Sequence, residues 1–138
     1  MTGIYILLIE LDRPKVVLVG KKRQFSLQQG FYGYVGSALS GLESRVGRHL
    51  SSMKSLHWHI DFLLTSAKIR KIICAETSER KECMVAKMLS KQLPWIAGFG
   101  CSDCKCQSHL FYCQDLSTLE TTVFDVVKSL GLDPFLFI

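Results

Sequence analysis

A run of thiols and an imidazole in the last third of the chain carries side chains suited to metal chemistry. Four soft ligands lie within nine residues at the spacing Cys-x2-Cys-x-Cys-x2-His, namely Cys101, Cys104, Cys106 and His109. Thiolate sulfur and imidazole nitrogen are the ligands of structural zinc sites, which usually join two separated ligand pairs. Small thiols also pack well in tight turns. The run therefore leaves three interpretations open: a zinc site, a thiol or redox site, and a turn packed by buried thiols.

A second group of potential ligands lies in the segment HWHIDFLL, residues 57–64. Its residues alternate in polarity, which predicts a half-buried strand with His57, His59 and Asp61 on one face. Two imidazoles and a carboxylate on one face could hold zinc or iron. Such a row is also typical of the polar face of a sheet, and beside a phosphate channel it could contact a substrate.

The basic residues are clustered, and the chain has a formal net charge of +5 and a pI near 8.9. The clusters are Lys21-Lys22-Arg23, then Arg45, Arg48 and Lys54, and then Lys68, Arg70 and Lys71. A surplus of positive charge favours an anionic partner, of which nucleic acid is a common one. The alternative is a solvated positive face without a specific ligand.

Length and composition predict one globular domain over residues 1–138. The longest strongly apolar run, residues 4–9, is far shorter than the ~20 residues that cross a bilayer. The start of the chain also lacks the pattern of a signal peptide. We therefore expect a cytoplasmic protein that does not enter membranes, with its six cysteines as reduced thiols or metal ligands.

The elements that must position these groups follow from the apolar pattern. Strands are predicted at 3–11 and 15–19, paired as an antiparallel hairpin, and at 31–36, 57–64, 69–76 and 109–113. Residues 21–30 are a short extra strand or an ordered loop, and the apolar tail 134–138 is docked. Helices are predicted at 37–50, at 79–93 and after a capping box that begins at Ser117. This irregular order predicts an α+β fold, a small and mainly antiparallel sheet flanked by helices.

Two tripeptides and the residues that follow them resemble the GIY-YIG nuclease superfamily. The set is Gly3-Ile4-Tyr5 in the first predicted strand, Tyr34-Val35-Gly36 in a later strand, Arg45 and His49 in the next helix, and Glu82 opening a later helix. With HWHIDFLL and GFGCSDCKCQSHLFY added, residues 2–113 look like an uncharacterised branch of that superfamily, found alone or fused to DNA glycosylases of the endonuclease III type.

The resemblance implies metal-dependent hydrolysis of phosphodiester bonds at five catalytic residues. It places the hydroxyls of Tyr5 and Tyr34 beside the attacking water. Arg45 would neutralise the non-bridging oxygens, and His49 would aid proton transfer or phosphate binding. Glu82 would hold a single divalent ion, Mg²⁺ or Mn²⁺. Nucleic acid would be gripped without base reading by Lys21, Lys22, Arg23, Arg48, Lys54, His57 and His59.

The chain also departs from the pattern of that superfamily. The gap between Tyr5 and Tyr34 is longer than a short hairpin, which indicates an inserted strand or loop at about residues 12–30. Ser37 stands where many members carry lysine, and the chain contains no asparagine.

Three functions remain as alternatives. The first is a DNA endonuclease for repair or processing, directed by DNA structure or damage, with RNA as a further possible substrate. The second is a non-catalytic nucleic-acid-binding module that assists a repair enzyme. The third is a structural zinc protein that uses the cysteine run and the HxHxD segment.

Overall fold

A five-stranded antiparallel sheet forms the centre of the molecule, in the strand order β6-β4-β1-β5-β7. The computed structural model describes residues 1–20, 23–52, 55–56, 58–101 and 104–138. The strands are β1 (Gly3–Leu11), β4 (Gly30–Ala38), β5 (Lys68–Glu76), β6 (Leu110–Cys113) and β7 (Phe135–Leu136). All neighbouring pairs are antiparallel. The predicted α+β fold with a mainly antiparallel sheet is confirmed.

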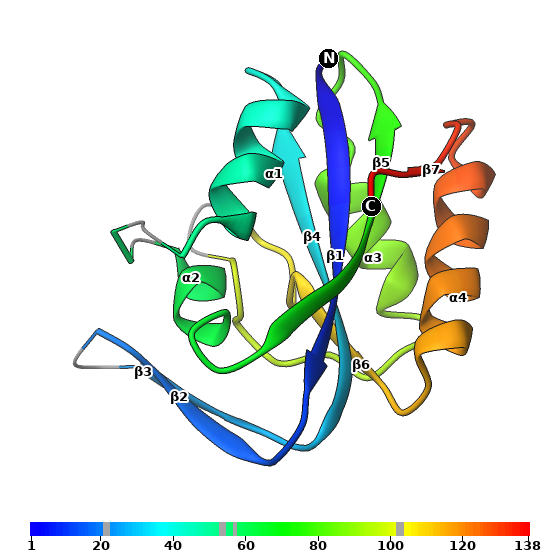
Figure 1. The fold of residues 1–138 in the computed structure, drawn as a ribbon. Helices are drawn as coiled ribbons and strands as arrows, with labels where there is room; N and C mark the ends of the chain where they lie inside the picture. Colours follow the sequence, from blue (N-terminus) through cyan, green and yellow to red (C-terminus); the bar gives the residue numbers. More distant parts are fainter. Residues whose placement is uncertain (21–22, 53–54, 57, 102–103) are drawn as a thin grey trace.

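Helices cover both faces of this sheet, as Figure 1 shows. α1 (Leu42–Leu50) and α2 (His59–Leu63) pack on one face, and α3 (Glu82–Leu89) and α4 (Leu116–Ser129) pack on the other. Successive side chains of a strand point to opposite faces. Tyr5 and Leu7 of β1 therefore enter the core under α1 and α2, whereas Ile4 and Ile6 enter the core under α3 and α4.

Residues 12–30, where an insertion was predicted, contain a separate two-stranded sheet of β2 (Lys15–Val19) and β3 (Arg23–Leu27). The prediction that 15–19 pairs with 3–11 is wrong. Both edges of β1 are paired, with β4 and with β5, and its two faces are buried in the cores under the helices. β2 is suited to a more exposed place, because Val17 alone is buried in it.

The strand predicted at 57–64 is also wrong, because residues 59–63 form the helix α2. The carboxylate of Asp61 accepts a hydrogen bond from the backbone N–H of Trp58 at 2.8 Å, which caps the first turn. Ile60 and Leu63 are buried at helical spacing. In so short a segment periodicity does not distinguish a strand from a helix, and here it favoured the wrong element.

Three predicted helices differ from the observed ones at their ends. α1 begins only at Leu42 because β4 continues through Ala38, and α3 is shorter than the predicted 79–93. The cap of α4 is Asp115 rather than Ser117, since Asp115 accepts from the Thr118 N–H at 2.8 Å. The docked tail is confirmed, because β7 pairs with β5.

An ion pair fixes α2 to α1. Arg48 donates to both carboxylate oxygens of Asp61, at 2.8 and 2.9 Å, and the side chain of Asp61 is fully buried. Arg48 also donates to the carbonyl of Ser55 at 3.1 Å. A buried carboxylate without its cation is costly, so this pair makes the position of α2 depend on α1.

We predict that Asp61→Ala lowers the free energy of unfolding by about 3 kcal/mol, because it removes the buried partner of Arg48 and the cap of α2. The measurement is chemical denaturation followed by circular dichroism. Asp12→Ala is the matched control, since Asp12 pairs with Arg13 on an exposed turn where both side chains are more than 70% accessible. The control should change stability by less than about 0.5 kcal/mol. Equal effects of the two substitutions would contradict the role given to the buried pair.

Candidate functional site

A cleft of about 750 Å³ gathers residues from both helical layers and from the sheet between them. Four of the five residues predicted to be catalytic line it: Tyr5 of β1, Tyr34 of β4, Arg45 of α1 and Glu82 of α3. The fifth, His49, is buried behind the cleft and shares a 2.7 Å hydrogen bond with the hydroxyl of Tyr5 through Nε2. The structure thus brings all five together.

The two tripeptides are in direct contact. β1 and β4 pair so that Tyr5 lies opposite Gly36, and the Tyr5 ring lies over this glycine. A Cβ at position 36 would overlap Cζ and Oη of Tyr5. Glycine at this position is therefore what allows the Tyr5 ring to lie flat across β4 and reach His49.

Burial keeps both tyrosine hydroxyls protonated. Burial raises the pKa of Tyr5 to about 12, against an opposing effect of the Arg45 guanidinium. The pKa of Tyr34 is raised in the same way, with a further contribution from the nearby Tyr5. At neutral pH both groups are neutral phenols, which can hold a water molecule through hydrogen bonds but supply no negative charge.

Trp58 supports the two arginines of α1. The guanidinium groups of Arg45 and Arg48 lie 4.5 and 4.1 Å from the centre of its ring, within cation–π distance. They differ in role, because Arg48 is held by Asp61 whereas Arg45 lines the cleft. Arg45 is the arginine of this pair that is placed to meet an anionic ligand.

Glu82 is the first residue of α3, and its Oε2 is buried without a hydrogen-bond partner among the residues that the structure describes. The neighbouring acids Glu76 and Glu79 are exposed and do not line the cleft. A buried carboxylate oxygen without a partner is unfavourable and needs an explanation. Oxygen is the ligand that Mg²⁺ takes, so the cleft presents a suitable donor for such an ion.

Of the residues predicted to bind nucleic acid, the structure describes Arg23, Arg48 and His59. Lys21, Lys22, Lys54 and His57 lie outside the described residues. Arg23 donates to the carbonyl of Gly98, and Arg48 is engaged with Asp61. His59 lines the cleft, and its Nδ1 accepts from the Gly100 N–H at 2.8 Å. Burial, with the charge of Arg23, lowers the pKa of His59, in keeping with a neutral ring that accepts this bond.

The row of ligands predicted on the strand face of 57–64 has no counterpart in the described residues, because that strand is a helix. His59 turns toward Gly100, whereas Asp61 turns toward Arg48.

Among the cleft residues that were not predicted, Arg80 and Trp58 carry side chains suited to contact with a nucleic acid. Arg80 is exposed and lies two residues before Glu82, a proximity in sequence that could have indicated it.

The cysteine run contributes to a four-residue group that is able to bind a metal ion. The ligand atoms of Cys83, Cys104, Cys106 and His109 lie within 4.8 Å of one another. The predicted set is corrected at one position: the thiol of Cys101 contacts the carbonyl of Phe99 at 3.4 Å, and Cys83 of α3 takes its place in the group. The preference of structural zinc sites for ligands from separated segments was the available signal, because it points outside the run.

We predict that Gly36→Ala lowers the free energy of unfolding by about 2 kcal/mol, since the new methyl group must displace the Tyr5 ring. Gly47→Ala is the matched control. Gly47 lies inside α1, and beyond its chain neighbours and the helix backbone no described atom lies within 4 Å of an added Cβ, so alanine should stabilise the protein by about 0.5–1 kcal/mol. Thermal and chemical denaturation measure both effects. In a Tyr5→Ala background the cost of Gly36→Ala should fall, and an unchanged cost would show that the clash is not with Tyr5.

Comparison with known proteins places the chain in a family without giving it an activity. None of the helices among the described residues is long and apolar enough to cross a membrane. No curated protein and no solved structure matches the chain. One family model matches residues 4–132, which include Tyr5, Tyr34-Val35-Gly36, Arg45, Glu82 and the metal-binding group. The chain therefore belongs to the family described as domain of unknown function DUF123.

Proposed function

We propose that the protein is a divalent-metal-dependent DNA endonuclease of the GIY-YIG type, acting on structured or damaged DNA in repair or processing. One observation carries the proposal: Tyr5, Tyr34, Arg45 and Glu82 come from four different elements and line the same cleft. These are residues that the resemblance to GIY-YIG nucleases names. The unpartnered Oε2 of Glu82 adds an oxygen donor suited to a divalent ion.

In the proposed reaction water attacks the phosphorus, one P–O ester bond breaks, and the leaving oxygen takes up a proton from solvent. The neutral hydroxyls of Tyr5 and Tyr34 hold the attacking water. As the water loses its proton to Tyr5 Oη, the proton of that hydroxyl passes along the 2.7 Å hydrogen bond to His49 Nε2. His49 is thus the base, and Tyr5 transmits its effect to the cleft.

Arg45 neutralises the non-bridging phosphate oxygens. Its planar guanidinium matches the spacing of two such oxygens, and Trp58 holds it from one side. Preorganised positive charge of this kind stabilises a phosphoryl transition state without reorganising during the reaction.

Glu82 would hold Mg²⁺ or Mn²⁺ through its buried Oε2. When bound, the ion supplies Lewis-acid stabilisation of the phosphate and the leaving oxygen. One carboxylate from the protein suits Mg²⁺, which usually keeps several waters and takes further ligands from phosphate.

The net charge of +5, Arg80 in the lining of the cleft and the exposed Arg23 favour binding of the phosphate backbone. Backbone contacts position a nucleic acid without reading its sequence, which fits a structure-directed enzyme.

The second candidate, a non-catalytic binding module of a repair complex, is favoured by the depth of the tyrosines. Tyr5 is 2% exposed and Tyr34 is 9% exposed, so little of either ring reaches a ligand in the cleft. Such a module would keep the basic residues that bind nucleic acid and leave cleavage to a partner enzyme.

We predict Mg²⁺-dependent nicking of branched, single-stranded or supercoiled DNA, with RNA as a parallel substrate. Tyr34→Phe, Arg45→Ala and Glu82→Gln should each lower the single-turnover rate by about 100-fold or more. They remove, in turn, a hydrogen bond to the attacking water, the positive charge at the phosphate and the ligand of the metal ion. Glu79→Gln is the matched control, since Glu79 is exposed and does not line the cleft. It should cleave at the wild-type rate.

Binding by fluorescence anisotropy, measured beside cleavage, separates the two candidates. Binding of DNA without cleavage by the wild-type protein would sink the nuclease and support the binding module. Equal losses in Glu82→Gln and Glu79→Gln would show that the cleft carboxylate has no special role.

A further inference from the structure

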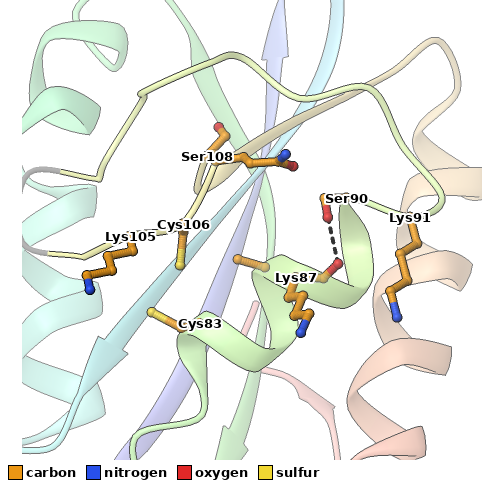
Figure 2. A pocket seen from close by; sticks show the side chains of 9 residues that line it. Cys83, Lys87, Ser90, Lys91, Lys105, Cys106 and Ser108 are labelled. Carbon is orange, nitrogen blue, oxygen red and sulfur yellow. Dashed lines mark hydrogen bonds between the residues drawn. The ribbon is translucent and has the colours of Figure 1, made fainter.

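We infer that Cys83, Cys104, Cys106 and His109 form a structural zinc site that anchors the start of α3. The four residues come from two separate segments of the chain. Cys83 lies in the first turn of α3, Cys104 and Cys106 lie on the loop that precedes β6, and His109 lies immediately before β6. Figure 2 shows the sulfur atoms of Cys83 and Cys106 facing each other from the helix and the loop.

The spacing of the donor atoms is close to that of a zinc tetrahedron. Zn–S bonds of about 2.3 Å and Zn–N bonds of about 2.1 Å place neighbouring ligand atoms roughly 3.5–3.8 Å apart. His109 Nε2 lies 3.5 Å from Cys104 Sγ and 3.9 Å from Cys83 Sγ. All ligand atoms of the group lie within 4.8 Å of one another, so the widest separation needs to close by about 1 Å at most.

The imidazole of His109 is already oriented as a ligand. Its Nδ1 lies 3.0 Å from the carbonyl oxygen of Val35, which can only accept a hydrogen bond. Nδ1 therefore carries the proton, and the lone pair of Nε2 points toward the thiols of Cys83 and Cys104. A backbone carbonyl on the second nitrogen is the usual arrangement that fixes a zinc-bound histidine. His109 is also 6% exposed, so this orientation is held by packing.

Charge at the site also suits zinc. Three thiolates, a neutral imidazole and Zn²⁺ together carry a net charge of −1. Lys87 and Lys105 line the cavity of about 490 Å³ that Cys83 and Cys106 share (Figure 2). Their ammonium groups can balance that charge, which a purely apolar packing of thiols would not need.

The anchor replaces a cap that α3 lacks. Its N-cap residue, Lys81, makes no side-chain capping hydrogen bond with any described residue. Zinc bound by Cys83 would join the first turn of α3 to the loop and, through His109 and Val35, to β4. Glu82 is the neighbour of Cys83, so the same ion would set the position of the Glu82 carboxylate. That positioning role rests on the proposed nuclease function, whereas zinc binding itself does not.

The test is the metal content of the full chain, purified without added metal under reducing conditions and measured by inductively coupled plasma mass spectrometry. We expect about one zinc per chain. Cys83→Ser and Cys106→Ser should lower the zinc content at least five-fold, whereas Cys101→Ser, the matched control, should keep it. Replacement of zinc by Co²⁺ should give the absorption of a tetrahedral thiolate site in wild-type protein and in Cys101→Ser, but not in Cys83→Ser.

Two results would overturn the inference even if a variant failed to fold. One is a wild-type protein that is folded by circular dichroism, contains no zinc and gives no thiolate absorption with Co²⁺. The other is loss of zinc in Cys101→Ser with full zinc in Cys83→Ser, which would show that the ligands are Cys101 and its neighbours in the cysteine run rather than Cys83.

Glu82→Gln separates the zinc site from the nuclease. It should lose cleavage and keep its zinc, because Glu82 is not one of the four ligands. A protein that holds zinc and cuts no nucleic acid would reject the proposed function alone. A protein that cuts without zinc would reject the anchor alone.

Discussion

The phenol ring of Tyr5 occupies the space that a side chain at position 36 would fill, and much of the cleft depends on this contact. The pairing of β1 with β4 sets the ring in place, and its hydroxyl meets His49 of α1. From α1, two arginines reach Trp58, and Arg48 continues to Asp61 of α2. A glycine in one strand thus allows a series of contacts that ends in a different layer of the molecule.

The cleft lies where the two helical layers come together beside β4. Tyr5 and Tyr34 belong to the core under α1 and α2, whereas Val35, which also lines the cleft, belongs to the core under α3 and α4. A strand alternates its side chains between the two faces of the sheet. A site that uses both helical layers must therefore form where helices from each face extend beyond the sheet. The loop before β6 completes the lining through Gly100 and His109.

The sequence predicted the parts of this structure that depend on local pattern, and failed where distant segments compete. The strands at 3–11, 31–36 and 69–76 were predictable because apolar residues fill both faces of a central sheet. The pairing of β2 with β3 was not predictable, because it depends on β4 and β5 occupying both edges of β1. The helix at His59–Leu63 depends on a carboxylate whose cation lies in another helix.

The candidate site, like the fold, was predictable from the sequence only in part. Tyr5, Tyr34, Arg45 and Glu82 could be named from a resemblance, but nothing in composition or spacing showed that they share a cleft. Cys83 was missed as a member of the metal-binding group because residues 84–100 separate it from the cysteine run, and only folding brings them together.

The adjacency of Glu82 and Cys83 has a mechanical consequence. Consecutive residues of an α-helix point about 100° apart around its axis, so the two side chains leave α3 in different directions. Glu82 lines the cleft together with the tyrosines. Cys83 lines the cleft as well, and its thiol lies close to the thiols of the loop. Any turn of α3 about its own axis moves both at once. A rotation of α3 that re-aims the carboxylate therefore also displaces the thiol from the other ligands of its group.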